Sequence, residues 1–508
     1  MKKIKDKSKM YMILGISFLV LSVLGSAYAY YKYVIATINV DTITRGLDYY
    51  INYTKGTDIT SAALNPGSDY TSGNSLSVTL YKKDNTYTIY GHIYLDISNI
   101  SANLSSSGAL KYAVLEGDTK IFGGKLTGVA TGNSIPLAVN IPLKTTSTKY
   151  TVYLWLDENA EDYMSAENTS ISATVRCEAT IKQIKILPYG TTGEYFYNKY
   201  TPNTTVINNG ITYNYDTTNS LMQDVGDNLR YYGASPNNYI YFNCSDYSNQ
   251  TSSTCETWRI IGVFNGKLKL ISSEPIGAYP WDTSVSTIND GYGENDWTNA
   301  TLMKLLNPGY ESETTGGSLY YNAKSGNCYS GSNNTTTTCD FTSGGIKNDT
   351  TRGLISDTAY YLGGYNTSEN IYSDQIYEYE RGTTVSTVGF PTTMVSKVAI
   401  PYPSDCGYAA DFKVCSMPLY GYDSSECTAN NWMYSTITVM GRVSGWLLTP
   451  FSDYSAVAWG EYYGGIISAD SSRLAENLRV SPVLYLNSDV SIASGSGTSS
   501  SPYKISIN

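Results

Sequence analysis

Histidine and charged side chains are what this sequence has least of. The chain of 508 residues contains one His, and Asp, Glu, Lys and Arg make up only 15 % of it, where about 25 % is typical. A single imidazole leaves no HExxH zinc motif, and the Gly-x-Ser-x-Gly, Walker and dinucleotide-binding motifs are also missing. The sequence therefore predicts no catalytic site and no bound metal, and the chain is interpreted as a non-enzyme.

Paired metal-binding cysteine motifs are missing too. The eight Cys include no Cys-x-x-Cys, so a zinc site built from Cys alone is a poor alternative. Six of them instead form pairs that are close in sequence, each able to close a short polar loop as a disulfide. The predicted pairs are Cys244 with Cys255, Cys328 with Cys339, and Cys415 with Cys427. Cys177 and Cys406 remain without a predicted partner.

Positive charge is scarce outside the N-terminus. Residues 1–10 carry five Lys and one Asp, a net charge of +4, which leaves −14 on the rest of a chain whose total is −10. An acidic body without a basic stripe argues against nucleic acid as a partner.

One hydrophobic run is long. Residues 10–31 hold no charge over 22 positions, which is enough for a membrane-spanning helix. The lysines before it predict a cytoplasmic tail at 1–10, a single-pass anchor at 11–31 and an extracellular remainder. A cleaved signal peptide is the alternative, because Ala27-Tyr28-Ala29 has the form of a cleavage site. Both alternatives export the rest of the chain from the cytoplasm, into an environment where disulfides form.

Residues 40–182 are interpreted as one domain, in which an irregular or strand-containing lead-in at 40–70 precedes strand-like alternation from Leu76 to Lys182. Leu76, Val78 and Leu80 alternate with polar residues, and similar runs recur near 89–97, 150–157 and 171–181. A period of two over several segments predicts an all-β antiparallel sandwich. The pattern places Cys177 on the core face and His92 on the polar, solvent-facing side.

The alternation stops at residues 183–205, which we interpret as a linker, and residues 206–508 predict a loop-rich α+β domain. Asn265-Gly266 between two apolar runs predicts a hairpin with a type I′ turn. Short helices are expected near 298–307, from 349 or 350 onward, and over 373–381, with a strand at 480–486 and a final strand or hairpin over 490–507.

Tyrosine and tryptophan are abundant, with 50 Tyr against 9 Phe and 7 Trp. Exposed aromatic rings stack well on sugars and proteins. Trp258, Trp297 and Trp446 lie within apolar runs and are assigned to the core. The candidate ligand-binding residues, which lie in Tyr- and Gly-rich segments, are Trp281, Trp459, Tyr462 and Tyr463.

Acidic residues gather at two places. Asp374, Glu378 and Glu380 form one group, and Asp290, Glu294 and Asp296 form the other. Spacing alone does not make a carboxylate pair a glycosidase site, and both groups are interpreted as solvated loops. Residues 289–296 offer oxygen ligands that could suit calcium, although they do not match the EF-hand loop.

Residues 11–181 resemble the bacterial TasA/camelysin-like family of secreted β-sandwich fibre subunits. The resemblance lies in the leader ending at Gly25–Ala29, in Leu110–Val114 and in Tyr150–Glu158. It implies an exported cell-surface or matrix protein that can self-associate through its sandwich. The peptidase activity sometimes attached to camelysins needs metal ligands that this sequence lacks.

Residues 210–508 resemble a module found at the ends of bacterial surface proteins, related to the C-type-lectin-like and formylglycine-generating-enzyme-like fold group. The matching stretches are Thr257–Gly262, Asp296–Asn307, Gly445–Pro450 and Arg479–Leu486. The lectin calcium tripeptide is absent, since Glu274-Pro275 is followed by Ile276. No cysteine follows Cys427, so the late cysteine pair of the formylglycine-generating enzymes is absent as well.

These observations predict an adhesion protein in which a β-sandwich stalk carries a distal lectin-like domain that binds a glycan or a protein. A structural subunit of a surface fibre or matrix is the first alternative, and an extracellular hydrolase is the second.

Overall fold

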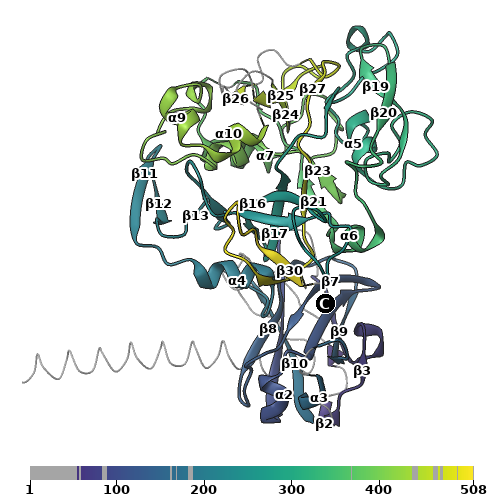
Figure 1. Cartoon of the computed structure of the whole chain (residues 1–508), viewed down its shortest axis with the longest axis vertical. Helices are drawn as coiled ribbons and strands as arrows, with labels where there is room; N and C mark the ends of the chain where they lie inside the picture. Colours follow the sequence, from purple (N-terminus) through teal and green to yellow (C-terminus); the bar gives the residue numbers. More distant parts are fainter. Residues whose placement is uncertain are drawn as a thin grey trace, which may run out of the picture. The chain divides into compact units, whose positions relative to one another are not determined.

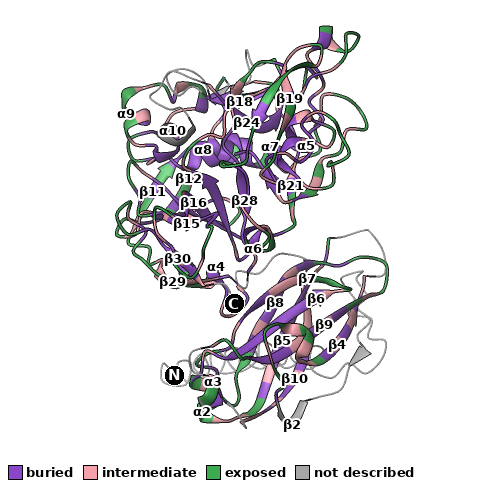
Figure 2. Cartoon of the chain, turned by 45° about the vertical axis from the view of Figure 1, so that its right-hand side comes forward, coloured by how far each residue is buried: buried purple, intermediate pink, exposed green. Residues whose placement is uncertain are grey.

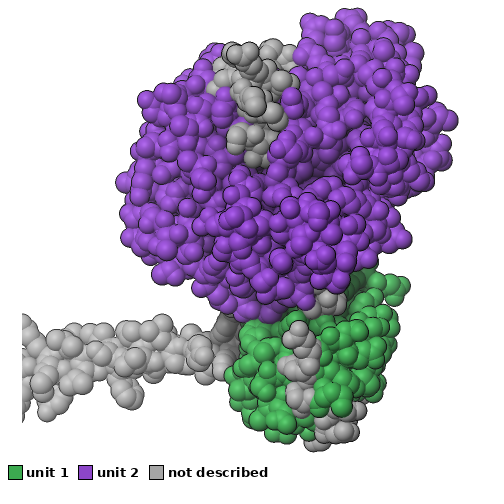
Figure 3. Space-filling view, in the orientation of Figure 1, with its two compact units in different colours: residues 1–189 green, residues 190–508 purple. Residues whose placement is uncertain are grey.

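The computed structural model describes most of the chain after its N-terminal segment. The described residues are 54–55, 59–82, 88–160, 163–166, 169–180, 187–367, 369–437, 444–461, 467–468, 473–488 and 490–506. They form two compact units, Met1–Tyr189 and Gly190–Asn508, coloured separately in Figure 3. The boundary falls inside the segment predicted as a linker. No helix in the described ranges is long and apolar enough to cross a membrane, and the predicted anchor at 11–31 lies outside them.

The first unit contains two β-sheets (Figure 1). One has the order β1-β4-β9-β6-β7, with β3 beside β9, and the other has the order β2-β10-β5-β8. Their elements are β1 Thr54–Lys55, β2 Ile59–Ala63, β3 Pro66–Gly67, η1 Tyr70–Ser72, β4 Asn74–Leu80, β5 Tyr90–Ile100, α2 Ala102–Ser106, β6 Leu110–Glu116, β7 Thr119–Lys125, β8 Ser134–Pro142, β9 Thr148–Asp157, α3 Tyr163–Ala166 and β10 Ser170–Thr180.

The core of this unit lies between the two sheets, as the alternation predicts. Leu76 and Val78 of β4 pack in one cluster with Ile93 of β5 and Ile171 of β10. Side chains of one parity from both sheets meet and exclude water, which makes this unit a β-sandwich. Cys177 is half-buried and packs against the edge of this core.

His92 corrects the prediction of a surface side chain, because it is fully buried. The pairing of β5 with β8 shifts register beside it, and Asn140 on β8 has φ 56°. This irregularity brings the Asn140 N–H to His92 Nδ1 at 3.1 Å, while His92 Nε2 lies 2.9 Å from Thr180 Oγ1. A bulge thus covers a residue that strict alternation would expose.

The second unit is built on an antiparallel sheet with the order β11-β12-β13-β14-β16-β17-β28-β23, with β15 beside β16. A second sheet has the order β18-β27-β24-β25-β26, and three two-stranded pairs complete the strands (Figure 1). The strands are β11 Thr204–Asn208, β12 Ile211–Asp216, β13 Leu221–Gln223, β14 Leu229–Tyr231, β15 Tyr239–Phe242, β16 Glu256–Phe264, β17 Lys267–Ser272, β18 Ala278–Tyr279, β19 Ser325–Gly331, β20 Thr335–Asp340, β21 Thr358–Tyr361, β22 Thr393–Ser396, β23 Val398–Ala399, β24 Gly445–Pro450, β25 Ala458–Glu461, β26 Ile467–Ser468, β27 Leu478–Arg479, β28 Val483–Tyr485, β29 Ser491–Ser494 and β30 Lys504–Ser506.

The helices of this unit are short. They are α4 Thr192–Lys199, η2 Asn289–Gly291, α5 Thr301–Leu306, α6 Asp349–Leu354, α7 Ser373–Glu380, α8 Pro403–Tyr408, η3 Leu419–Gly421, α9 Ser425–Ala429 and α10 Trp432–Ile437. Helix α4 occupies the segment predicted as a linker, because Phe196 packs into the core of this unit. The β-rich character with few helices agrees with the sequence prediction.

The predicted hairpin is present as β16 and β17. Asn265 and Gly266 both have positive φ, 50° and 79°, as the two central residues of a type I′ turn require. Helix α5 begins later than predicted, and the distant side chain of Asp282 pairs with its first N–H group: Asp282 Oδ1 accepts from Thr301 N at 2.9 Å. The buried positions along β16 and β28 place both strands inside the main core (Figure 2).

Candidate functional site

Two of the predicted ligand-binding residues are not at the surface. Trp281 and Trp459 are both 0 % exposed, so the prediction that they form a contact surface is wrong. Trp281 packs edge-on against Trp297 at 4.9 Å and donates its Nε1–H to Leu447 O. The neighbouring Gly460 is typical of a surface loop in sequence, whereas in the structure Trp459 and Gly460 both lie in the buried strand β25. Tyr462 and Tyr463 lie outside the described residues.

Trp459 leads to a candidate site that the sequence prediction missed. Its Nε1–H donates to Tyr365 O at 3.3 Å. The ring of Tyr365 stacks on the ring of Tyr379, with centroids 4.0 Å apart and planes inclined by 24°. Tyr365 is half-buried and Tyr379 is 40 % exposed. We call these two stacked rings the tyrosine platform.

Two glycines allow the platform to form. A Cβ on Gly363 would lie 2.3 Å from Tyr379 O, and one on Gly364 would lie 2.6 Å from Pro450 O. These approaches are too close for any larger residue, so Gly363-Gly364 lets the chain after β21 pass between the end of α7 and β24. The Gly363 N–H donates to Glu380 O at 3.0 Å, which fixes Tyr365 beside the last turn of α7.

Polar groups flank the platform. Asn366 Nδ2 donates to Asp453 Oδ2 at 3.0 Å, and both side chains are exposed. Tyr454, the next residue, is 48 % exposed. Burial and the neighbouring Tyr379 raise the pKa of Tyr365 above that of an ordinary phenol, which is itself neutral at physiological pH. An aromatic face beside amide and carboxylate groups suits a ligand with both apolar C–H faces and hydroxyl groups.

A small recess borders the same backbone segments. Pro450 lines it, and Gly364 N binds Thr384 O at 2.8 Å, one residue before the lining residue Val385. The lining residues are Asn295, Trp297, Leu362, Val385, Ser386, Phe390, Pro391 and Pro450. Its walls are mainly apolar and hold no carboxylate among the described residues.

The first acidic group is divided by its helix. On α7, Asp374 and Glu380 are buried whereas Glu378 is exposed. Asp374 accepts from Asn209 Nδ2 at 3.1 Å, and Glu380 accepts from Ser404 N at 2.9 Å. Burial raises the pKa of Glu380 to about 7. The interpretation of a wholly solvated group is therefore wrong for Asp374 and Glu380, which form internal hydrogen bonds rather than a facing pair.

The segment proposed for calcium binds its own chain. Asn295 Nδ2 donates to Phe451 O and Val457 O, and Asp296 accepts from Thr298 N at 3.0 Å. Asp290 is exposed, Glu294 is half-buried and Asp296 is buried. Within the part of the chain that the structure describes, no group of three or more His, Cys, Asp or Glu side chains is placed to hold a metal ion.

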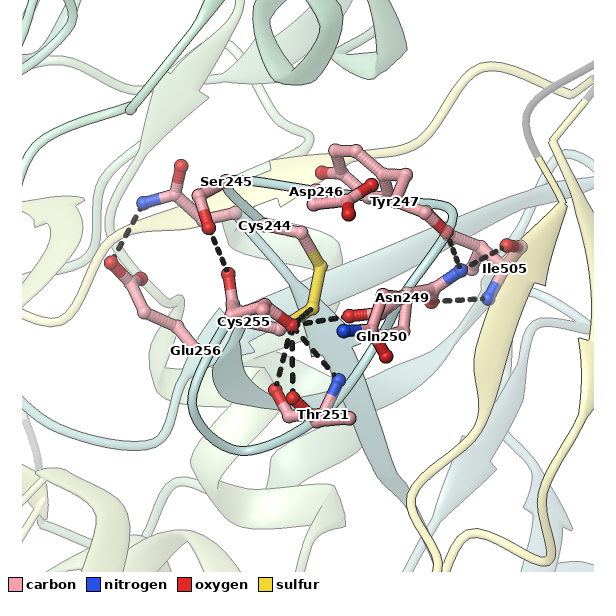
Figure 4. Close-up of a disulfide and its surroundings, with 12 residues drawn as sticks. Cys244, Ser245, Asp246, Tyr247, Asn249, Gln250, Thr251, Cys255, Glu256 and Ile505 are labelled. Atoms are coloured by element: carbon pink, nitrogen blue, oxygen red, sulfur yellow. Dashed lines mark hydrogen bonds between the residues drawn. A yellow bond between two sulfur atoms is a disulfide. The ribbon is translucent and has the colours of Figure 1, made fainter.

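The three predicted disulfides are present, as Cys244–Cys255, Cys328–Cys339 and Cys415–Cys427. The first closes a loop that is tied to the C-terminal strand β30, since Gln250 exchanges two hydrogen bonds with the backbone of Ile505 (Figure 4). The loop itself has little apolar content, so the disulfide and these hydrogen bonds hold its shape. Cys177 and Cys406 are not bonded to one another or to another described cysteine.

Comparisons with known proteins give no family. No family model and no curated protein matches the chain. A solved structure, PBCV-1 VP54 fitted into a cryo-EM reconstruction of the virophage Sputnik, aligns over 91 % of this chain and 89 % of that chain, with 9 % sequence identity. The TM-score of this alignment is 0.15, which is too low to carry an argument about fold or function.

Proposed function

We propose that this chain is a membrane-anchored, extracellular binding protein whose second unit recognises a glycan at the tyrosine platform. The observation that carries the proposal is the stacked pair of half-buried Tyr365 and exposed Tyr379, which lies against the buried Trp459. Rigid aromatic faces lose little entropy on binding, and sugar rings offer C–H faces that stack on them. Asn366 and Asp453 supply hydrogen-bonding groups beside the rings.

Export is supported by the three disulfides, all in the second unit, since such bonds persist in oxidising compartments. The anchor at 11–31, with a cytoplasmic tail at 1–10, is the sequence-based part of the proposal. A lectin-like architecture for residues 206–508 is a further sequence-based part of the proposal, while in the second unit, Gly190–Asn508, the two ends of the chain come together. Phe196 of α4 packs edge-on against Tyr503 next to β30, at 5.3 Å.

The proposal is tested by glycan-array binding of the full chain. We expect Tyr379→Ala to weaken binding about fivefold, because the loss of a stacking contact of about 1 kcal/mol corresponds to that factor. Tyr420→Ala is the matched control, since Tyr420 is similarly exposed, at 44 %, and is outside the stacked pair. Absence of any bound glycan, or equal effects of the two variants, would overturn the proposal.

Self-association through the sandwich is the second candidate function. Among the described strands, β7 and β8 each end one of the two sheets of the first unit, and an open sheet edge can pair with another chain. Sedimentation of the full chain over a wide concentration range tests this candidate. A single monomeric species at every concentration would exclude assembly into a fibre or matrix. An extracellular hydrolase gains no support from the two recesses lined by Tyr279 and by Pro450, since neither has a carboxylate among its described lining residues.

A further inference from the structure

Lys269 of β17 and Asp405 of α8 meet in the interior of the second unit. Lys269 Nζ lies 2.5 Å from Asp405 Oδ2, and both side chains are at most 1 % exposed. They come from segments far apart in the sequence, on the central sheet and on a helix packed near it. An ammonium and a carboxylate are thus held in direct contact without access to bulk water.

The surroundings of this pair are aromatic. Three rings lie near Lys269 Nζ, with centroids at 4.6 Å for Tyr402, 5.1 Å for Phe264 and 5.6 Å for Tyr485. Taking two charges out of water into such a site is costly, and their attraction repays that cost only in part. Burial lowers the pKa of Lys269 to about 8, against the opposing effect of Asp405. The site therefore favours chemistry that removes both charges.

The other charged groups nearby, Arg230 and Asp224, remain paired when Lys269 and Asp405 lose their charges. Arg230 Nη1 donates to Asp405 Oδ1 at 2.8 Å, and Arg230 Nε donates to Asp224 Oδ2 at 2.5 Å. Arg230 therefore keeps an anionic partner even when Asp405 is neutral. The hydrogen bond to Oδ1 also persists when that oxygen belongs to an amide, because an amide carbonyl accepts as a carboxylate does.

The geometry points to an intramolecular isopeptide bond between Lys269 Nζ and Asp405 Cγ, formed by the folded protein itself. One ammonium proton passes across the contact to Oδ2, giving an amine and a carboxylic acid. The amine lone pair then forms the N–C bond at Cγ. A second nitrogen proton passes to Oδ2, the Cγ–Oδ2 bond breaks with its electron pair, and water leaves. Oδ1, held by Arg230, becomes the amide oxygen.

Nothing else is consumed in this condensation, which is neither an oxidation nor a reduction. Holding the two groups in contact supplies the high effective concentration that the bimolecular reaction lacks. Exclusion of water protects the product from hydrolysis. The bond would join the central sheet to α8 covalently and enclose the Cys328–Cys339 hairpin within one loop, which suits a surface protein exposed to mechanical load and proteases.

Mass spectrometry of the full chain tests this inference directly. After reduction and alkylation of the disulfides, trypsin is expected to leave Lys269 uncleaved. It is expected to yield a branched peptide that joins Lys269 to Asp405 and is lighter than its two linear parts by one water. Cleavage after Lys269, together with an unmodified peptide containing Asp405 in near-complete yield, would overturn the inference.

Two Lys→Arg variants on β17 distinguish the loss of the isopeptide bond from a general effect of substituting a lysine on this strand. Lys269→Arg keeps the charge but removes the nucleophile, so the branched peptide should vanish completely. Lys267→Arg is the matched control, because Lys267 is half-exposed and its Nζ donates to Ser356; the branched peptide should persist in it. The wild-type result decides the inference even if Lys269→Arg folds poorly. Persistence of the mass deficit in Lys269→Arg would place the linkage elsewhere and overturn it.

Discussion

The two units reach a packed interior by different means. In the sandwich, the large core cluster consists of aliphatic side chains from two sheets, such as Leu76 and Ile171, with few aromatic rings among them. The second unit instead buries six large Trp side chains, Trp258, Trp281, Trp297, Trp432, Trp446 and Trp459. It also buries a cluster of four charged residues, Asp224, Arg230, Lys269 and Asp405, and closes loops with disulfides. The backbone N–H and C=O groups of regular strands pair with each other, whereas those of long loops need polar side chains as partners. The disulfides then restrain the shape of the loops.

Because of this difference, we expect different kinds of substitution to destabilise the two units. A sandwich core tolerates the loss of a surface group and responds mainly to cavities and to buried polar groups of its own. The second unit depends on a few polar residues, such as Asp224 and Asn295, that each bind several backbone groups. Loss of one such residue leaves several buried groups without partners.

The largest loss of stability is expected when one residue of the buried charge cluster of the second unit is substituted. The cluster consists of Asp224, Arg230, Lys269 and Asp405. Asp224→Ala should destabilise the second unit by about 3–5 kcal/mol, because Arg230 is left buried beside fewer anions. Asp224 also accepts from Gly226 N and Asn228 N, both at 2.9 Å. Calorimetry of the full chain should show the transition of the second unit moving to lower temperature and the sandwich transition unchanged.

The sandwich has its own buried pair, Lys111 with Asp157, which provides the matched comparison. Lys111→Met should lower only the sandwich transition. If either variant lowers both transitions together, the two units unfold as one, and the contrast drawn between them fails.

The next largest effect is expected from a fall in pH, because the contributions of His92 and Glu380 to the stability of their units change in opposite directions. Burial lowers the pKa of His92 to about 4, below its ordinary value, so the unfolded chain binds the proton more readily. The contribution to stability is therefore complete above about pH 6.5 and is lost as the pH falls toward 4, by at most about 3 kcal/mol. In the second unit, Glu380 has its pKa raised to about 7, so its contribution changes in the opposite direction and weakens as the pH rises from about 4.5 to 7.

Denaturant unfolding of the full chain at pH 7 and pH 4.5, followed for each transition, measures this contrast. His92→Gln retains a donor for Thr180 and an acceptor for Asn140 without a titrating group. It should flatten the pH dependence of the sandwich. An equal pH dependence in wild type and His92→Gln would show that other groups dominate.

How much the sequence predicts also differs between the units. Strict alternation identified the buried faces of β4, β5 and β9, because a strand buried on one face encodes its environment locally. His92 was misplaced since a bulge is not visible in the alternation. In the second unit the type I′ hairpin and the disulfide pairs were predicted, as both are local patterns.

What could not be predicted in the second unit depends on contacts between distant segments. Asp405 meets Arg230 and Lys269 across more than a hundred residues, and no local pattern marks the three as partners. Tyr365 and Tyr379 form the platform only because Gly363-Gly364 passes close to α7. The glycine pair was visible in the sequence, and a Gly-Gly-Tyr stretch beside an amphipathic helix was the signal that could have found it.

The smallest of the predicted losses of stability follows from removal of a disulfide. Replacing both Cys244 and Cys255 by Ser should destabilise the second unit by about 2–3 kcal/mol, since a short closed loop restricts the unfolded chain by about that amount. The sandwich should not respond, because its one described cysteine, Cys177, is unbonded. Dithiothreitol added to the wild-type chain should likewise lower one calorimetric transition only.

The Cys244–Cys255 pair is the sharper choice among the three because its loop holds the C-terminal strand through Gln250 and Ile505 (Figure 4). Gln250→Ala in the intact disulfide background removes those two hydrogen bonds alone. If the double Ser variant and Gln250→Ala destabilise equally, the disulfide acts by positioning Gln250 rather than by restricting the unfolded chain. A larger loss in the double Ser variant supports the covalent restraint as the means by which this loop-rich unit replaces regular strand pairing.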